Sequence, residues 1–255
     1  MIELIKGKLN EIEEKENIKI IHAVESGSRA WGFPSPDSDY DVRFIYIRPL
    51  EDYLKLQPER DVIEWQMDET LDINGWDLQK ALRLLYKSNP TLFEWANSPI
   101  VYKTTPYFNE VKKEIYSYFS CKSGLYHYLN TAHSNYREYL KRDKVRLKKY
   151  FYVVRPILAC KWILDKKTPP PMLFSDLVRE ELDDRMKPVI GELLNIKMKS
   201  PEIEEGRRID PLNLYIEENL EELKSVIDKY EKDYNNSWDG LNRLFMKGIS
   251  LWNEG

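Results

Sequence analysis

Two aspartates separated by one residue, Asp39 and Asp41, follow eleven and thirteen residues after Ser28 of a Gly27-Ser28 pair. If this stretch is a strand, residues i and i+2 project from one face, so we expect the two carboxylates to converge. Two carboxylates held side by side repel each other unless a cation lies between them. Hard divalent ions such as Mg²⁺ are the natural occupants of such a site. The spacing therefore predicts a magnesium site.

The Gly27-Ser28 pair follows a strand-like run over residues 18–25. A glycine lets the backbone approach a phosphate closely, and a serine that begins a helix directs N–H groups and a hydroxyl toward an anion. A phosphate beside metal-binding acids is the arrangement used for phosphoryl transfer with two metal ions. We therefore expect a phosphate at this turn.

A third carboxylate would help to hold the first ion and could accept a proton. Asp72 is the candidate, because strand alternation turns Leu71 and Ile73 toward the core and Asp72 toward the other face. Asp77 is acidic and near in sequence, but it is better explained as the N-cap of the helix that follows. The choice between Asp72 and Asp77 stays open at this point.

Two arginines flank these acids, and each has two interpretations. Arg43 shares a strand face with Asp41, so it could contact phosphate or neutralise the acids. Arg29 follows the serine and could meet phosphate or be a solvated helix residue.

The elements that must position these residues form a mixed α/β first half. An amphipathic helix is expected near the N-terminus, from the apolar spacing of residues 2, 5, 9 and 12. Strands are then predicted over residues 18–25, 40–47, 62–65 and 69–73. From Asp77 the apolar period becomes helical, and Asn89-Pro90 separates two short helices.

Beyond residue 106 nearly all of the sequence reads as helix. The expected helices cover residues 107–119, 124–141, 144–164, 174–197 and 212–232, with an N-cap at Asp210. The prediction is an α/β (α+β) protein: a small mixed β-sheet domain over residues 1–105 that carries the candidate acids, then an all-helical domain over residues 106–255.

The helical half intersperses tyrosines with cations. The set is Tyr136, Arg137, Lys148, Lys149, Tyr152 and Arg155. Three of them, Lys148, Tyr152 and Arg155, recur at i, i+4 and i+7, so one helix face could present all three to a base and its phosphates. The alternative is an amphipathic helix with core tyrosines and solvated cations. The basic run over residues 141–149 also suits an RNA backbone.

Composition sets the frame. The 255 residues are 42% hydrophobic and 32% charged, with a net charge of -4, which is typical of soluble globular proteins and argues against a nucleic-acid coat. No apolar stretch approaches the ~20 residues that span a bilayer, and no signal pattern precedes the first helix, so a cytoplasmic protein without a membrane partner is expected. The two cysteines, Cys121 and Cys160, are expected to be buried thiols.

The Gly-Ser pair and Ser38-Asp39-Tyr40-Asp41-Val42 resemble the signature of the DNA polymerase beta-like nucleotidyltransferase superfamily. Within it, residues 27–32 and 72–95 are similar to predicted nucleotidyltransferases that include RNA-ligase-associated polymerases. The resemblance covers about the first 105 residues strongly. It implies a nucleotidyltransferase catalytic domain over residues 1–105 and a helical nucleotide- and substrate-binding domain over residues 106–255. It extends more diffusely into the helical half, through residues 148–152 and Arg155-Pro156.

The resemblance implies a role for each motif residue. Gly27 and Ser28 would contact the triphosphate, Asp39 and Asp41 would bind both Mg²⁺ ions, and Asp72 would complete the triad. A nucleoside triphosphate would bind between the two domains, and an acceptor hydroxyl would attack its α-phosphate and release pyrophosphate.

The acceptor stays open. It could be an RNA 3' end, a protein hydroxyl or a small-molecule hydroxyl. A non-catalytic nucleotide-binding interaction module is the alternative class, and its expected mark is a lost metal-binding acid, whereas all three acids are present here.

Overall fold

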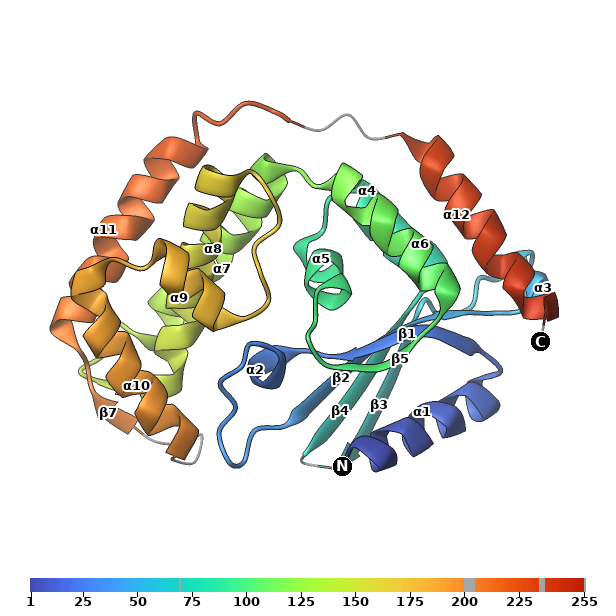
Figure 1. Cartoon of the computed structure of the whole chain (residues 1–255), viewed down its shortest axis with the longest axis horizontal. Helices are drawn as coiled ribbons and strands as arrows, with labels where there is room; N and C mark the ends of the chain where they lie inside the picture. The colour runs from blue at the N-terminus through green and yellow to red at the C-terminus, as the bar shows by residue number, and fades with distance from the viewer. Residues whose placement is uncertain (69, 200–204, 234–236, 255) are drawn as a thin grey trace. The chain divides into compact units, whose positions relative to one another are not determined.

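The computed structural model describes residues 1–68, 70–199, 205–233 and 237–254. Its contacts divide the chain into two compact units (Figure 1). The first unit combines residues 1–30, 39–118 and 235–255, and the second combines residues 31–38 and 119–234. This grouping differs from a division at residue 105, and the predicted roles of the two domains remain predictions. Among the described residues, no helix is both long and apolar enough to span a bilayer.

The first unit is built on a mixed five-stranded sheet with the order β3-β4-β2-β1-β5. Its strands are β1 (Lys19–Glu25), β2 (Tyr40–Ile47), β3 (Val62–Asp68), β4 (Leu71–Asp77) and β5 (Val101–Thr104). Only the β2–β4 pair of this sheet is parallel, and the other neighbours run antiparallel. Together with the helices this confirms the predicted mixed α/β class. Glu69, the expected start of the fourth strand, lies outside the described residues.

Alternation along β4 separates the core from the candidate site. Leu71 and Ile73 are buried, while Asp72 and Asn74 on the other face are partly exposed. In the parallel register, Asp41 of β2 lies directly opposite Asp72. A slip of one residue would turn either aspartate into the core, so the apolar pattern fixes the pairing.

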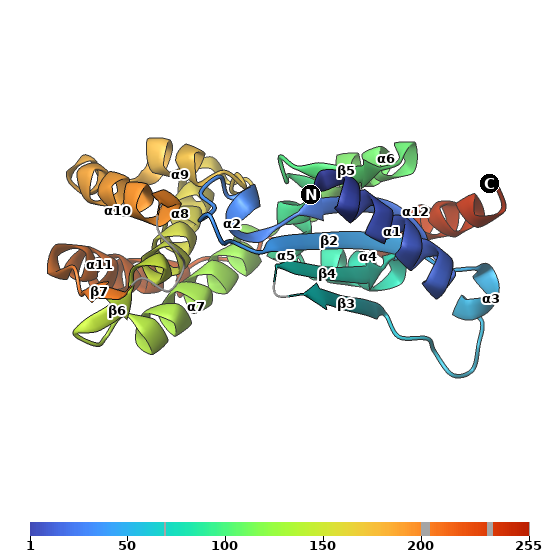
Figure 2. The same ribbon diagram turned by 90° about the horizontal axis from the view of Figure 1, so that it is seen from below.

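Helices cover both faces of the sheet (Figures 1 and 2). The unit's helices are α1 (Ile2–Glu16), α2 (Gly27–Ala30), α3 (Leu50–Tyr53), α4 (Leu78–Tyr86), α5 (Pro90–Ala96), α6 (Pro106–Ile115), η1 (Tyr116–Tyr118), α12 (Trp238–Ser250) and η4 (Leu251–Glu254). Three residues of α1 (Ile5, Leu9 and Ile12) pack into the same core as Val42 and Phe44. On the opposite face, the ring of His22 in β1 stacks on Phe108 of α6 with centroids 3.7 Å apart.

The α12 helix belongs to the sheet unit, although it follows the helical region in sequence. The hydroxyl of Tyr107 in α6 donates to the Leu244 carbonyl of α12 at 2.6 Å. Gly248 lets α12 approach closely, because a Cβ there would lie 2.5 Å from Leu78 Cδ2. These contacts, far apart in sequence, place the final helix with the sheet rather than with the predicted helical domain.

The second unit is helical. Its helices are α7 (Cys121–Tyr139), η2 (Leu147–Tyr150), α8 (Phe151–Lys166), α9 (Phe174–Glu181), η3 (Asp184–Met186), α10 (Lys187–Lys199) and α11 (Asp210–Ile227). Both cysteines are buried thiols, as expected. The segment over residues 31–38 joins this unit because Phe33 packs against Phe151 and Phe174, with ring centroids 5.0 and 5.2 Å apart.

Three helix predictions differ from the structure. The stretch predicted as one helix from residue 144 begins instead with strand β6 (Lys144–Arg146), which pairs with β7 (Glu205–Arg207). The helix predicted over residues 174–197 is interrupted, because the backbone at Leu182 is extended. At α11 the N-cap is Ile209 rather than Asp210, which is already in the first turn.

Candidate active site

The Gly27-Ser28 turn packs directly on the Asp41 carboxylate. Gly27 has φ 59°, a left-handed conformation that glycine adopts without strain. A Cβ at this position would lie 2.1 Å from Asp41 Oδ2. Just before the turn, the Ser26 N–H donates to the Asp41 carbonyl at 2.8 Å. Both the conformation and the space at this position therefore require glycine.

Asp41 and Asp72 converge on a single cationic group. One guanidinium nitrogen of Arg43 (Nη2) lies 3.0 Å from Asp41 Oδ1 and 2.7 Å from Asp72 Oδ2. The other nitrogen (Nη1) donates to the carbonyls of Val42 and Asp72. The carboxylates remain accessible, with side chains 31% and 50% exposed. Of the two interpretations of Arg43, its geometry matches neutralisation of the acids.

These two carboxylates fit part of a divalent-metal site. They supply hard oxygen donors that converge on one point, the Nη2 atom of Arg43, and such donors are the ligands that Mg²⁺ prefers. Within the part of the chain that the structure describes, no group of three or more His, Cys, Asp or Glu side chains is clustered closely enough to hold a metal. Asp39, the third predicted ligand, is therefore not clustered with Asp41 and Asp72.

Asp39 is exposed and lies immediately before β2 rather than within it. Its carbonyl accepts a hydrogen bond from Arg29 Nε at 3.0 Å. The Arg29 guanidinium also lies over the ring of Tyr40, 3.7 Å from the centroid. Arg29 thus holds the chain at the entry to β2, and the predicted roles of both residues stay predictions.

A buried glutamate beside the site was not predicted. Glu25 is fully buried at the end of β1, and its Oε1 accepts the Asp41 N–H at 2.7 Å. Its other oxygen accepts the hydroxyl of Tyr102. Burial raises the pKa of Glu25, while the bonds from Tyr102 and the Asp41 N–H act in the opposite direction. The available signal was alternation, because Glu25 follows two residues after the buried Ala23 on a strand.

Asp77 lies at the other end of β4 from Asp72 and caps α4. Its Oδ1 accepts the Gln79 N–H at 2.7 Å, and its Oδ2 accepts the Tyr53 hydroxyl at 2.8 Å. Burial is the main cause that raises the pKa of Asp77, which is 4% exposed. The predicted N-cap is confirmed, and the β4 register brings Asp72, not Asp77, opposite Asp41.

The predicted nucleotide-binding cations of the helical region lie in the second unit. Lys148 is in η2, so it does not share one continuous α-helix with Tyr152 and Arg155 of α8. Arg155 is 5% exposed, and its guanidinium lies 4.5 Å from the centroid of the Trp31 ring. Tyr152 also contacts Trp31, edge-on at 5.6 Å. The expected single face is therefore not formed, and nucleotide binding by these residues stays a prediction.

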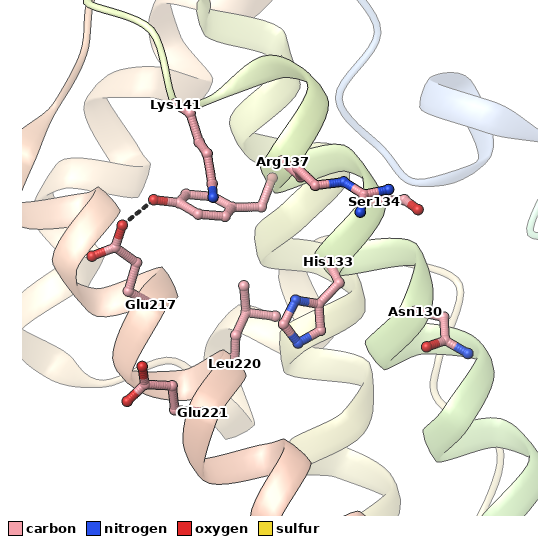
Figure 3. Close-up of a pocket in the computed structure, with 9 residues that line it drawn as sticks. Asn130, His133, Ser134, Arg137, Lys141, Glu217, Leu220 and Glu221 are labelled. Atoms are coloured by element: carbon pink, nitrogen blue, oxygen red, sulfur yellow. Dashed lines mark hydrogen bonds between the residues drawn. The ribbon is translucent and has the colours of Figure 1, made fainter.

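A cavity of about 570 Å³ lies between α7 and α11 of this unit (Figure 3). Tyr136 is on its wall, and its hydroxyl donates to Glu217. Arg137 and Lys141 line one side, and Glu217 and Glu221 line the other. Both signs of charge are therefore present on the wall of this cavity.

Comparison with known proteins connects the carboxylate pair to a family. A model of the RNA repair pathway DNA polymerase beta family matches residues 1–247. The chain belongs to this family. It is accordingly a nucleotidyltransferase, and the resemblance of the Gly-Ser and Asp-x-Asp motifs to the superfamily signature is confirmed.

One relative is the uncharacterised protein YcgL of Bacillus subtilis (strain 168), which is 42% identical to this chain over 261 residues. The match covers 100% of this chain and 99% of that protein. The uncharacterised protein MJ0002 of Methanocaldococcus jannaschii is 36% identical over 112 residues, 42% of this chain and 44% of that one. A solved nucleotidyltransferase-like protein from Exiguobacterium sibiricum 255-15 is similar at 13% identity with a TM-score of 0.33, covering 88% of this chain and 74% of that one.

Proposed function

We propose that the protein is a magnesium-dependent nucleotidyltransferase that moves a nucleoside monophosphate from a nucleoside triphosphate to the 3' hydroxyl of an RNA. The observation that carries the proposal is the convergence of Asp41 and Asp72 on one cationic position, under the Gly27 turn. The family description, which names RNA repair, supports an RNA acceptor.

In the proposed reaction, Asp41 and Asp72, with Asp39, would hold the magnesium ions. When bound, such ions supply positive charge to the triphosphate and acidify an attacking hydroxyl. The acceptor oxygen forms a bond to the α-phosphorus, the bond to the β-phosphate oxygen breaks, and pyrophosphate leaves. Asp72 would accept the proton of the hydroxyl, and Gly27 and Ser28 would contact the triphosphate.

Glu25 has a positioning role in this proposal. It receives the backbone N–H of Asp41 and is itself held by Tyr102. A carboxylate fixed through its backbone keeps its orientation when its charge partner changes, which is what electrostatic preorganisation requires.

The test is transfer of a labelled triphosphate to RNA, protein extract and small alcohols offered separately. We expect label on an RNA that ends in a 3' hydroxyl and none on the same RNA with a 3'-deoxy end. Asp41→Asn and Asp72→Asn should abolish transfer while leaving the fold intact. Asp61→Asn removes an exposed acid paired with Lys80 and should have no effect.

Three results would reject parts of the proposal. Full activity in Asp41→Asn or Asp72→Asn would reject the assigned carboxylates. Label on protein or a small alcohol, with none on RNA, would reject the RNA acceptor. Triphosphate binding by calorimetry without turnover on any acceptor would reject the enzyme and support a nucleotide-binding module.

A further inference from the structure

A two-stranded ribbon in the second unit gathers positive charge. We call it the basic ribbon: strands β6 and β7, paired antiparallel (Figure 2), with the residues that flank them. Its exposed cations are Lys141, Arg142, Lys144, Arg146, Arg207 and Arg208. The chain as a whole has a net charge of -4, so this is a local concentration of charge rather than a general property of the surface.

The ribbon places like charges directly opposite one another. In its register Lys144 pairs with Arg207, while Arg146 faces Glu205 and Val145 faces Gly206. Two cations opposite each other in an antiparallel ladder destabilise it. The Lys144–Arg207 pair thus costs stability in the isolated protein, and an external anion would relieve that cost.

Carboxylates of the protein neutralise few of these cations. Among the residues that the structure describes, Arg208 forms an ion pair with Asp210 at 2.7 Å, and the other five ribbon cations lie within 4 Å of no carboxylate oxygen. On α1, by contrast, Lys6, Lys8 and Lys15 all pair with glutamates of the same helix. Two acids, Asp143 and Glu205, lie in the ribbon as well, so its positive charge is offset in part and remains in excess.

The ribbon also borders a hollow of about 340 Å³ that is lined by cations and an aromatic ring. Three cations line it (Arg142, Lys144 and Arg146), together with Tyr139 and two carboxylates, Glu138 and Glu205. The Tyr139 ring is itself held by Lys149, whose Nζ lies 3.9 Å from the ring centroid. Cations at phosphates beside an aromatic ring are how single-stranded nucleic acid is bound. Carboxylates on the same wall can accept hydrogen bonds from 2' hydroxyls.

We propose that the basic ribbon binds the sugar–phosphate backbone of a single-stranded RNA, the strand that serves as acceptor. That this RNA is the acceptor strand rests on the proposed function. The binding of RNA by the ribbon does not depend on catalysis. Lys144, Arg146 and Arg207 contact phosphates, and Tyr139 offers a ring edge or face to one base.

The experiment measures binding of a labelled single-stranded RNA by fluorescence anisotropy, without any triphosphate, over a series of salt concentrations. The variant Lys144→Gln/Arg146→Gln/Arg207→Gln should bind at least ten times more weakly. Its plot of log affinity against log salt should be flatter by about 2, because each phosphate that is no longer neutralised lowers the slope by roughly 0.7. The matched control Lys224→Gln/Lys229→Gln/Lys232→Gln removes exposed cations near the other end of α11 and should leave both quantities unchanged.

Circular dichroism of the ribbon variant should match that of the unaltered protein, and the variant should melt no earlier, because it loses a like-charge pair. Equal RNA affinity and salt slope in the ribbon variant and the unaltered protein would overturn the inference. Competition by polyglutamate as effective as competition by RNA would overturn it too, in favour of an acidic peptide. Asp41→Asn should bind RNA normally, so loss of transfer with intact binding would separate the two proposals.

Discussion

At the residue scale, the carboxylate pair is stabilised by a side chain of the protein itself. Arg43 Nη2 lies within hydrogen-bond distance of both Asp41 and Asp72, so their mutual repulsion is relieved without an added ion. A divalent ion that binds the same oxygens must share them with the guanidinium or displace it. Arg43 is therefore expected to lower the affinity of the site for metal while keeping the acids in place.

Arg43→Gln tests this competition. The variant should be less stable by roughly 1–2 kcal/mol without divalent ions, a modest cost because the acids are partly exposed. Added MgCl₂ should then raise its melting temperature by more than it raises that of the unaltered protein. Arg60→Gln, which breaks an exposed pair with Glu64, is the control. MgCl₂ should raise its melting temperature by as much as it raises that of the unaltered protein. An equal magnesium response in Arg43→Gln would contradict the competition.

His22 should make stability depend on pH. Burial against α6 lowers its pKa from 6.5 to about 4, so the unfolded chain binds a proton between those values and the folded protein does not. Stability should fall as the pH drops through this window, by roughly 1.4 kcal/mol per pH unit. The measurement compares urea unfolding of His22→Asn with the unaltered protein from pH 7 to 4. The unfolding free energy of His22→Asn should lack this fall between pH 6.5 and 4. His127→Asn, at an exposed position, should show the same fall as the unaltered protein.

At the element scale, substitutions at Asp77, the N-cap of α4, test whether Asp72 or Asp77 is the third carboxylate. Asp77→Asn keeps an N-cap acceptor, so it should cost less than about 1 kcal/mol, and nucleotide transfer should persist. Asp77→Ala loses the cap and the bond from Tyr53, and should destabilise by about 1–2 kcal/mol. The readouts are thermal melting and transfer activity side by side. Loss of transfer in a stable Asp77→Asn protein would shift the third carboxylate from Asp72 to Asp77.

The strands that carry the acids could be predicted from the sequence, whereas strand β6 could not. The sheet strands that carry the acids were predicted because apolar alternation is a local signal. Strand β6 was not, since it exists only by pairing with β7, about sixty residues later. Its setting depends on Gly206, where a Cβ would lie 2.9 Å from Leu147 Cδ2. No window of sequence around residue 144 contains that partner.

The site followed the same rule. Asp41, Asp72 and the Gly27 turn could be predicted, because each has a local pattern. The position of Arg43 between the acids depends on the β2–β4 register, which is a pairing over about thirty residues. The Glu25–Tyr102 contact joins strands β1 and β5 in the same way. Sequence reasoning thus named the candidate acids and Arg43, and it missed Glu25 and Tyr102, which hold the backbone of Asp41.

At the scale of the whole molecule, the sheet unit depends on a helix from the far end of the described chain. Gly248→Ala tests how much. Its Cβ would lie 2.5 Å from Leu78 and 2.6 Å from Tyr107 Oη, so α12 should be pushed away at a cost of about 1–3 kcal/mol. Hydrogen exchange should become faster in α4 and α6 and stay unchanged in α8.

Gly191→Ala is the matched control, because nothing lies within 4 Å of its new methyl group. Alanine favours helix over glycine, so this variant should be as stable as the unaltered protein or slightly more so. Faster exchange in α8 of Gly248→Ala, equal to that in α4, would mean that the chain opens as one cooperative unit rather than as two.

The discontinuous sheet unit has a consequence for biosynthesis. The helices α7 and α8 precede α12 by many residues, so they leave the ribosome first and can pack against each other before α12 is available. The sheet that holds Asp41 and Asp72 leaves the ribosome earlier still, yet Leu78 and Tyr107 stay uncovered until α12 has also left it. The sheet strands, which precede the helical unit in sequence, would thus reach full stability after it. A chain arrested before α12 should have protease-resistant helices and a sheet that proteases cut.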